Sequence, residues 1–308
     1  MIFKDILKSK GLPLSKEFDN LLQVAYSTQK HKGDLLLIYI NGFYQPEIEE
    51  WNKSPNVKEK LNPHVIGIGV EGHSEQSHYS FIHKYRTTHI SELDSVEYLK
   101  KFEWSQDRKT EIDELIEAEE TTIQLEMLVY LKIWEADMII KKFYELVKLL
   151  HGESYDWYFR ISNSARDNNA TGSRQDIWRL KIRDRLANIS PPIYNLLKDT
   201  YSTQIRNAIA HSNYSFQDRS IQLLNFIKDD PASQLKSITF EKWTEIFHNT
   251  LLLHNEYISI NNQINDFYGD IAMKNKGILE ILITEKNGKQ YELPLEFRLK
   301  YKDWHYLQ

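Results

Sequence analysis

Residues 206–211, Arg-Asn-Ala-Ile-Ala-His, contain the residue types that cleavage of an RNA phosphodiester without a metal requires. Attack by the 2′-hydroxyl needs a base for its proton, an acid for the departing 5′-oxygen and positive charge near the phosphate. Histidine suits the proton transfers because its unperturbed pKa lies near neutrality, and arginine suits the phosphate because its donors form a planar fork. We therefore take Arg206, Asn207 and His211 as candidate catalytic residues.

The spacing of these three residues sets a condition on the local structure. On a helix, Asn207 and His211 share a face because they are four residues apart, whereas Arg206 lies about 100° aside. The three can converge only if His211 belongs to a loosening last turn, and Ser212 and Asn213 follow it as terminators. One histidine cannot easily be both acid and base, so we expect a homodimer that presents two Arg–His pairs to one RNA strand.

Helical patterns surround this stretch. Residues 111–150 contain no proline or glycine and repeat apolar residues at intervals of three and four, which predicts one long helix or two stacked ones. The prolines at 191 and 192 start a helix that runs to about His211, because proline is tolerated in a first turn. A further helix is predicted from about Phe240 to Asp270. Together these segments predict a helical bundle.

The ends of the chain differ from its middle. Residues 5–30 have helical spacing with a break near Gly11 and Pro13, and residues 65–70 and 79–85 have β-like composition. Residues 214–224 indicate a small hairpin or an extended return.

Residues 278–284 and 291–301 flank Lys286-Asn287-Gly288 and predict a C-terminal β-hairpin. We thus expect a mainly α protein in three parts: a mixed α/β region over 1–105, a helical domain over 106–275 and a hairpin extension over 276–308.

Composition excludes several classes of protein. The 308 residues are 41% apolar and 27% charged with a net charge of −5, which is typical of a globular protein and not of one that coats nucleic acid. No stretch approaches the ~20 apolar residues of a membrane span, and charged residues interrupt the N-terminal apolar residues. We therefore expect a cytoplasmic protein with no membrane partner.

The chain contains no cysteine, which excludes disulfides, thiolate zinc sites and a cysteine nucleophile. The histidines at 73, 78, 83 and 89 are five, five and six residues apart, intervals that fit neither a helical pair nor a zinc motif. We predict no metal site and no cofactor.

The stretch resembles the motif of the HEPN superfamily (higher eukaryote and prokaryote nucleotide-binding domains). The family pattern is Arg, a polar residue that is often Asn, three to five further residues and then His, which Arg206, Asn207 and His211 match position by position. The helical context, roughly Glu111 to Asp270, also fits. The resemblance implies a HEPN-like helical bundle and a metal-independent RNase that acts as a homodimer.

Many members of that family are toxins or abortive-infection effectors in bacterial defence against phage, and the resemblance implies the same setting here. RNA cleavage by attack of the 2′-hydroxyl, as the resemblance implies, would leave 2′,3′-cyclic phosphate and 5′-hydroxyl ends. A free cytoplasmic RNase needs restraint, which an antitoxin, a regulatory partner protein or the N-terminal region of the chain could supply.

Two other interpretations stay open. Arg206 and His211 could cap the C-terminal carbonyls of their helix, where cations are favoured. Alternatively, a degenerate HEPN-like module could bind a nucleotide or a protein partner in a defence or regulatory complex without cutting.

A basic helix precedes the motif. Arg174, Trp178, Lys181 and Arg185 lie at offsets of four, seven and eleven, which places them on one face of a regular helix. This face could guide an RNA backbone, with the tryptophan stacking on a base. The alternative is a solvated basic face with the tryptophan packed inward.

Residues 67–72, Gly-Ile-Gly-Val-Glu-Gly, match the letters of the dinucleotide-binding motif and follow a β-like segment. We expect no helix after Gly72 and no βαβ unit around it, so glycines in a turn are the favoured explanation.

Overall fold

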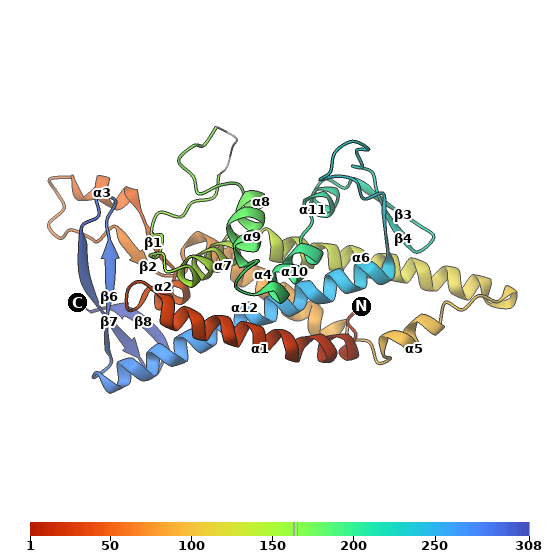
Figure 1. Cartoon of the computed structure of the whole chain (residues 1–308), viewed down its shortest axis with the longest axis horizontal. Coiled ribbons are helices and arrows are strands. Elements are labelled where there is room, and N and C mark those ends of the chain that lie inside the picture. The colour runs from red at the N-terminus through yellow and green to blue at the C-terminus, as the bar shows by residue number, and fades with distance from the viewer. Residues whose placement is uncertain (163, 165, 308) are drawn as a thin grey trace. The chain divides into compact units, whose positions relative to one another are not determined.

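The computed structural model describes residues 1–162, 164 and 166–307. Helices make up 57% of the chain and strands 13%, which confirms a mainly α fold with small sheets. Figure 1 shows the order of the elements along the chain. No helix in the described part is both long enough and apolar enough to cross a membrane.

The chain divides into two compact units, each assembled from three separate segments. Unit 1 comprises Met1–Glu17, Ser74–Ala136 and Leu186–Glu256, and unit 2 comprises Phe18–His73, Asp137–Arg185 and Tyr257–Gln308. The sequence instead predicts three parts with boundaries after residues 105 and 275. A linear division cannot capture units whose segments alternate along the chain.

Unit 1 is mainly helical with one small sheet. Its elements are the start of α1 (Lys4–Thr28), most of α4 (Gly69–Thr88), α5 (Ser95–Lys100), η1 (Gln106–Arg108), α6 (Lys109–Trp134), α10 (Pro191–Thr200), α11 (Thr203–Ala210), β3 (Tyr214–Gln217), β4 (Ser220–Leu223), β5 (Ser237–Thr239) and the first half of α12 (Phe240–Lys274). The three strands pair in the order β3-β4-β5, and the predicted hairpin after the motif is thereby confirmed.

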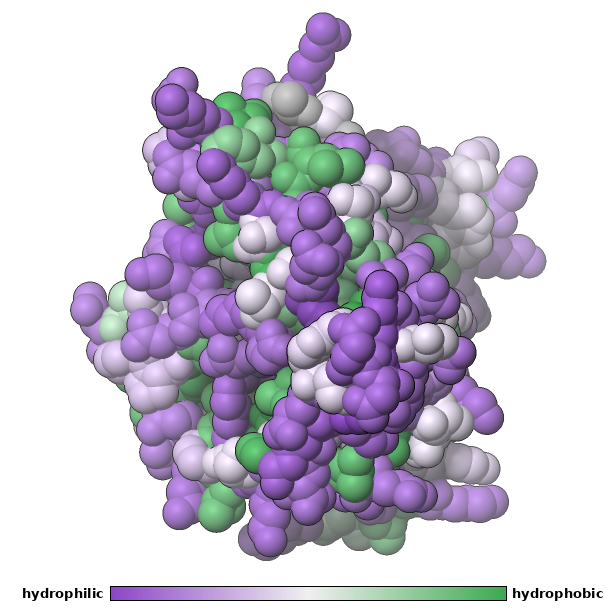
Figure 2. Space-filling model, turned by 90° about the vertical axis from the view of Figure 1, so that its right-hand side faces the viewer, coloured by the Kyte–Doolittle hydropathy of each residue, from purple (hydrophilic) through white to green (hydrophobic). Residues whose placement is uncertain are grey.

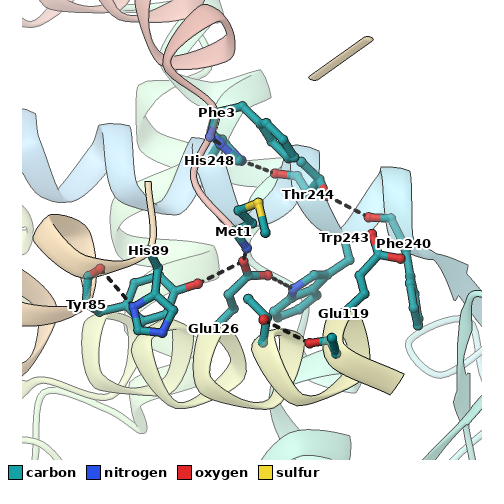
Figure 3. Close-up of polar contacts among 12 residues, drawn as sticks. Met1, Phe3, Tyr85, His89, Glu119, Glu126, Phe240, Trp243, Thr244 and His248 are labelled. Carbon is teal, nitrogen blue, oxygen red and sulfur yellow. Dashed lines mark hydrogen bonds and ion pairs between the residues drawn. The ribbon is translucent and has the colours of Figure 1, made fainter. Parts of the chain in front are cut away.

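Helices α6 and α12 run parallel through the core of unit 1. Trp134 of α6 donates from Nε1 to Thr250 Oγ1 (3.2 Å), and Trp243 of α12 donates from Nε1 to Glu126 Oε2 (2.7 Å). Both tryptophans are fully buried. Figure 3 shows the Glu126 carboxylate, which also accepts from Tyr85 Oη (3.0 Å) and contacts the amino group of Met1. These bonds satisfy a carboxylate that would otherwise be costly to bury.

Unit 2 combines helices with two antiparallel sheets. Its elements are the rest of α1 and α12, the start of α4, α2 (Asp34–Ile40), β1 (Gly42–Tyr44), α3 (Pro46–Asn52), β2 (His64–Ile66), α7 (Asp137–Leu150), α8 (Arg174–Asp176), the π-helical segment η2 (Ile177–Arg183), α9 (Asp184–Leu186), β6 (Ile278–Thr284), β7 (Gln290–Arg298) and β8 (Asp303–Tyr306). Strands β1 and β2 pair with each other, and β6, β7 and β8 pair in that order. The predicted C-terminal hairpin is confirmed as β6 and β7, with β8 as an additional strand.

Four local expectations are wrong or incomplete. Helix α1 continues through Gly11 and Pro13, with Leu14 and Phe18 buried beyond the proline. Residues 79–85 belong to α4, where Ile82 and Tyr85 are buried at a helical interval. The helix predicted from the prolines to the motif is interrupted at Tyr201 and Ser202.

The fourth expectation concerns the glycine-rich segment 67–72. Helix α4 begins at Gly69, inside this segment, and directly follows the short strand β2. The expectation that no helix follows this segment is therefore wrong. A βαβ unit would need parallel strands, whereas β1 and β2 form a two-stranded antiparallel sheet.

Candidate active site at the end of α11

Helix α11 is short and has defined ends. At its start, Ser202 Oγ accepts a hydrogen bond from the backbone N–H of Ile205 (3.3 Å), as an N-cap residue does. At its end, Ser212 adopts a left-handed conformation with φ of 54°. The helix thus places Arg206 and Asn207 in its middle and His211 directly after its last residue.

Backbone groups satisfy the C-terminal carbonyls of α11. The N–H of Asn213 donates to Ala208 O (2.7 Å) and the N–H of Ser212 donates to Ile209 O (3.2 Å), which is the Schellman pattern. The N–H of His211 donates to Asn207 O (3.0 Å). Because these carbonyls already have donors, the side chains of Arg206 and His211 are not needed as caps.

The guanidinium of Arg206 is held by two neighbours. Its Nη1 donates to Asn207 Oδ1 (2.6 Å), and its Nε forms an ion pair with Glu135 at the end of α6. The Arg206 side chain is 21% exposed, so it lies at the surface with its fork partly engaged. Asn207 therefore orients one end of the guanidinium.

The side chain of His211 is exposed and, within the described residues, forms no hydrogen bond. The structure brings Arg206 and Asn207 together but shows no contact between either of them and the imidazole. His211 is thus available to solvent and to a ligand, which differs from an imidazole packed against its own helix.

Contacts with α6 fix the start of α11. Tyr130 Oη donates to Thr200 O (3.1 Å) and accepts from the N–H of Ser202 (3.4 Å), so one hydroxyl bridges the break between α10 and α11. The ring of Trp134 lies 5.1 Å from that of Tyr201. Since Tyr130 and Trp134 are fully buried, the motif is presented by a rigid part of unit 1.

Sequence reasoning misses Glu135. It lies 71 positions before Arg206, at the C-terminus of α6, and no local pattern links the two residues. Only the tertiary packing of α11 on α6 brings its carboxylate to the guanidinium.

The predicted RNA-binding face is not arranged as expected. Residues 177–183 form a π-helix, whose wider turn shifts the angular positions of the side chains, so the offsets of four, seven and eleven no longer define one face. Trp178 is 1% exposed and packs against Phe143 with ring centroids 5.6 Å apart. Its side chain is therefore not available to stack on a base, and the alternative of an inward tryptophan is correct.

The cations of this segment are engaged within unit 2. Arg174 forms an ion pair with Asp137 (2.7 Å), Lys181 Nζ donates to Thr171 O (2.5 Å) and Arg185 pairs with Glu153. Their charges are thus partly compensated. All four predicted RNA-binding residues belong to unit 2, whereas the motif belongs to unit 1.

No group of three or more His, Asp or Glu side chains in the described residues is placed to hold a metal ion. Comparison of the chain with protein-family models, curated proteins and solved structures finds no match.

Proposed function

We propose that this protein is an endoribonuclease of the HEPN type that cuts RNA at Arg206, Asn207 and His211 without a metal cofactor. It acts as a homodimer in the cytoplasm, in bacterial defence against phage or as a toxin whose activity a partner protein restrains. The observation that carries the proposal is an exposed imidazole directly after α11, on the same short helix end as an arginine that Asn207 orients, with the C-terminal carbonyls of α11 bound by backbone N–H groups.

The reaction is an internal transesterification. His211 of one copy accepts the proton of the 2′-hydroxyl, and the 2′-oxygen forms a bond to phosphorus. The bond from phosphorus to the 5′-oxygen breaks, and His211 of the second copy donates a proton to that oxygen. The products are a 2′,3′-cyclic phosphate and a 5′-hydroxyl, and Arg206 stabilises the negative charge that grows on the phosphate oxygens.

The test is cleavage of total tRNA and mixed RNA in EDTA by the wild type and by two variants, Arg206→Ala and His211→Ala. We expect both variants to lose at least about a hundredfold in rate, the lower end of what a general acid–base contributes. Arg108→Ala and His305→Ala are matched controls, because both residues are partly exposed and lie outside the site. Circular dichroism verifies that every variant is folded.

Equal cleavage by the wild type and both site variants contradicts the assignment. So does a wild type that cuts none of these RNAs, alone or with added cell extract.

A second candidate function, a non-catalytic module that binds a protein, is favoured by one observation. Figure 2 shows a mostly hydrophilic face on which apolar residues gather in a few places. In unit 1, the segment that follows β4 exposes Leu224, Ile227 and Leu235 by 65%, 56% and 45%. Gln204 of α11 binds this segment through Leu235 O (2.7 Å), so a partner bound there would lie next to the motif helix.

The two candidates respond differently to substitution. Replacing Leu224 and Ile227 by serine leaves RNA cleavage unchanged if the protein is a nuclease whose site is Arg206–His211. If the protein is only a binding module, the wild type does not cleave RNA. The substitution of Leu224 and Ile227 then weakens the binding of the partner protein.

A further inference from the structure

Unit 2 contains a cavity of about 630 Å³ that the proposed nuclease function does not use. Its walls come from the β1–α3 segment, the start of α4, the start of α7 and the chain that follows Tyr158. The volume is within the range of small-molecule sites. The lining includes the polar residues Asn41, Glu71 and Lys141, the first residues of α4 and several aromatic side chains.

The ammonium group of Lys141 lies in the wall of this cavity although the residue is only 7% exposed. Two of its three N–H donors bind neutral oxygens, Asn41 Oδ1 (2.7 Å) and Gly42 O (2.7 Å). Among the described residues it forms no ion pair, and its third donor has no acceptor. The ammonium also lies 5.8 Å from the ring centroids of Phe43 and Tyr155, and the charges of nearby carboxylates offset only part of the cost of its burial. A bound anion would stabilise this cation further.

The surrounding chain holds Lys141 in a fixed position. Asn41 adopts a left-handed conformation with φ of 49°, and its Nδ2 donates to Gly67 O (2.8 Å). Tyr155 Oη donates to Gly42 O (2.6 Å), the carbonyl that Lys141 also binds. These bonds fix the carbonyl and amide acceptors, and they leave the third donor of the ammonium without a protein acceptor.

The start of α4 forms a second polar wall. Gly67 and Gly69 have φ of 147° and 58°, and the first helical bond runs from the N–H of Gly72 to Ile68 O (2.8 Å). The N–H groups of Gly69, Val70 and Glu71 therefore lie in a first turn that has no intrahelical acceptor for them. Such a turn favours an anion.

A carboxylate of the chain now occupies this end of α4. Glu71 Oε2 lies 3.0 Å from the position that a Cβ at Gly69 would take, so the side chain folds back over its own first turn. Glu71 is exposed and can swing away, which makes it a replaceable stand-in for a ligand anion.

Aromatic side chains complete the lining. Phe43, Tyr44 and Phe159 line the cavity beside the polar walls, and Val70 is 82% exposed at the same place. Planar rings are good partners for another planar ring. The cavity thus combines positions for an anion and for a ring.

We propose that this cavity binds a free nucleoside phosphate, with its phosphate between Lys141 and the first turn of α4 and its base against the aromatic side chains. The segment Gly67–Gly72 supplies the backbone of the phosphate wall. The two-stranded antiparallel sheet before it distinguishes the site from a dinucleotide fold, whose sheet is parallel. The proposal depends only on unit 2 and not on the RNase assignment.

Burial lowers the pKa of Lys141 to about 8, mainly through desolvation. The charged groups that face it are Glu145 and Lys142 of α7, Glu71 of α4 and Asp156. The amine is therefore still largely protonated at pH 7, and a bound phosphate adds negative charge to that of the carboxylates, none of which forms an ion pair with it in the described residues.

Isothermal titration calorimetry at pH 7 tests the proposal with the intact chain. The probes are the four common nucleoside 5′-monophosphates, their triphosphates, the nucleosides, inorganic phosphate and a short single-stranded RNA without terminal phosphate. We expect at least one nucleoside phosphate to bind at least about tenfold more tightly than its nucleoside and than inorganic phosphate.

Two variants change the affinity in opposite directions. Lys141→Met, which has similar length and no charge, should weaken binding at least about tenfold. Glu71→Gln should tighten it about threefold or more, because a neutral side chain competes less for the first turn, and its surface position preserves folding. Lys289→Met, on an exposed turn, is the control that should leave binding unchanged.

No binding of any nucleoside phosphate, or binding that neither Lys141→Met nor Glu71→Gln changes, overturns the proposal. Binding of the RNA alone overturns it as well, since the occupant would then not be a free nucleotide. Cleavage assays on the Arg206 and His211 variants are independent of these outcomes.

Discussion

The guanidinium of Arg206 contacts one neutral and one charged side chain. Asn207 Oδ1 orients one end of the guanidinium, and the ion pair with Glu135 compensates much of its charge. A phosphate must therefore compete with Glu135 for the same fork. In the proposed mechanism, Glu135 is a positioning residue whose charge opposes RNA binding.

This competition predicts the effect of Glu135→Gln. The KM for RNA should fall about two- to fivefold, because a partly exposed ion pair contributes up to about 1 kcal/mol, and kcat should change less. Steady-state kinetics on a short RNA measure both constants. Glu153→Gln, which breaks the ion pair with Arg185, is the matched control. An unchanged or higher KM for Glu135→Gln contradicts this role.

Glu145 of α7 gives a second prediction at the scale of one residue. It is fully buried, Asp156 N donates to its Oε2 (3.0 Å), and burial raises the pKa of its carboxyl to about 8. The folded state thus binds a proton that the unfolded state has lost above about pH 4.5. The contribution of Glu145 to the free energy of unfolding is therefore fully present below pH 4.5 and is lost as the pH rises through 8.

We therefore expect the free energy of unfolding of the wild type, relative to that of Glu145→Gln, to fall by up to about 1.4 kcal/mol per pH unit between pH 5 and 8. The comparison cancels the contributions of other groups, among them Asp34, whose pKa burial raises to about 7. Urea unfolding at four pH values measures the difference. A difference that stays constant over this range refutes a protonated Glu145.

At the scale of the element, the end of α11 decides where His211 lies. Ser212 takes a left-handed conformation that glycine adopts at no steric cost, and the two bonds of the Schellman pattern depend on it. Ser212→Gly should raise the free energy of unfolding by about 0.5–1 kcal/mol and leave RNA cleavage within about twofold. Ser212→Val should lower both stability and cleavage, because a β-branched residue does not fit this conformation.

Ala210→Gly is the control for this pair, since it weakens the last position of α11 by up to about 1 kcal/mol and leaves Ser212 in place. Thermal unfolding and cleavage rates are measured side by side. If Ser212→Val cuts RNA as fast as the wild type, the turn does not position His211.

The elements differ in how far the sequence predicts them. The apolar repeats over 111–150 correctly predict helix, and Ser212 and Asn213 correctly mark the end of α11, because both signals are local. The pattern over 79–85 predicts a strand, yet burial of Ile82 and Tyr85 follows the helical period in α4. The segment 177–183 is a π-helix in which Trp178 packs against Phe143, and no local signal in the sequence marks it.

The same distinction applies to the candidate site. The three motif residues are adjacent in sequence, so their types and spacing predict them directly. Glu135 reaches Arg206 only through tertiary packing, and Lys141 reaches the glycine-rich segment in the same way. Residues that a fold brings together from distant positions cannot be inferred from one sequence without an independent constraint.

At the scale of the whole molecule, the proposed chemistry needs two copies of the chain. Each copy contributes one His211, so RNA cleavage per mole should rise with protein concentration in step with the dimer fraction. Analytical ultracentrifugation and cleavage assays over the same concentrations measure the two quantities. A protein that stays monomeric and cuts at a constant rate per mole contradicts the two-histidine mechanism.

The chemical groups at the cut ends test most directly whether the protein cleaves RNA by attack of the 2′-hydroxyl. An RNA oligonucleotide and the same sequence with 2′-deoxy sugars are incubated with the protein in EDTA, and mass spectrometry identifies the products. The proposed transesterification predicts 2′,3′-cyclic phosphate and 5′-hydroxyl ends from the RNA. It also predicts that the deoxy oligonucleotide stays uncut and that His211→Ala gives no products. Cleavage of the deoxy oligonucleotide, or 5′-phosphate ends, contradicts it.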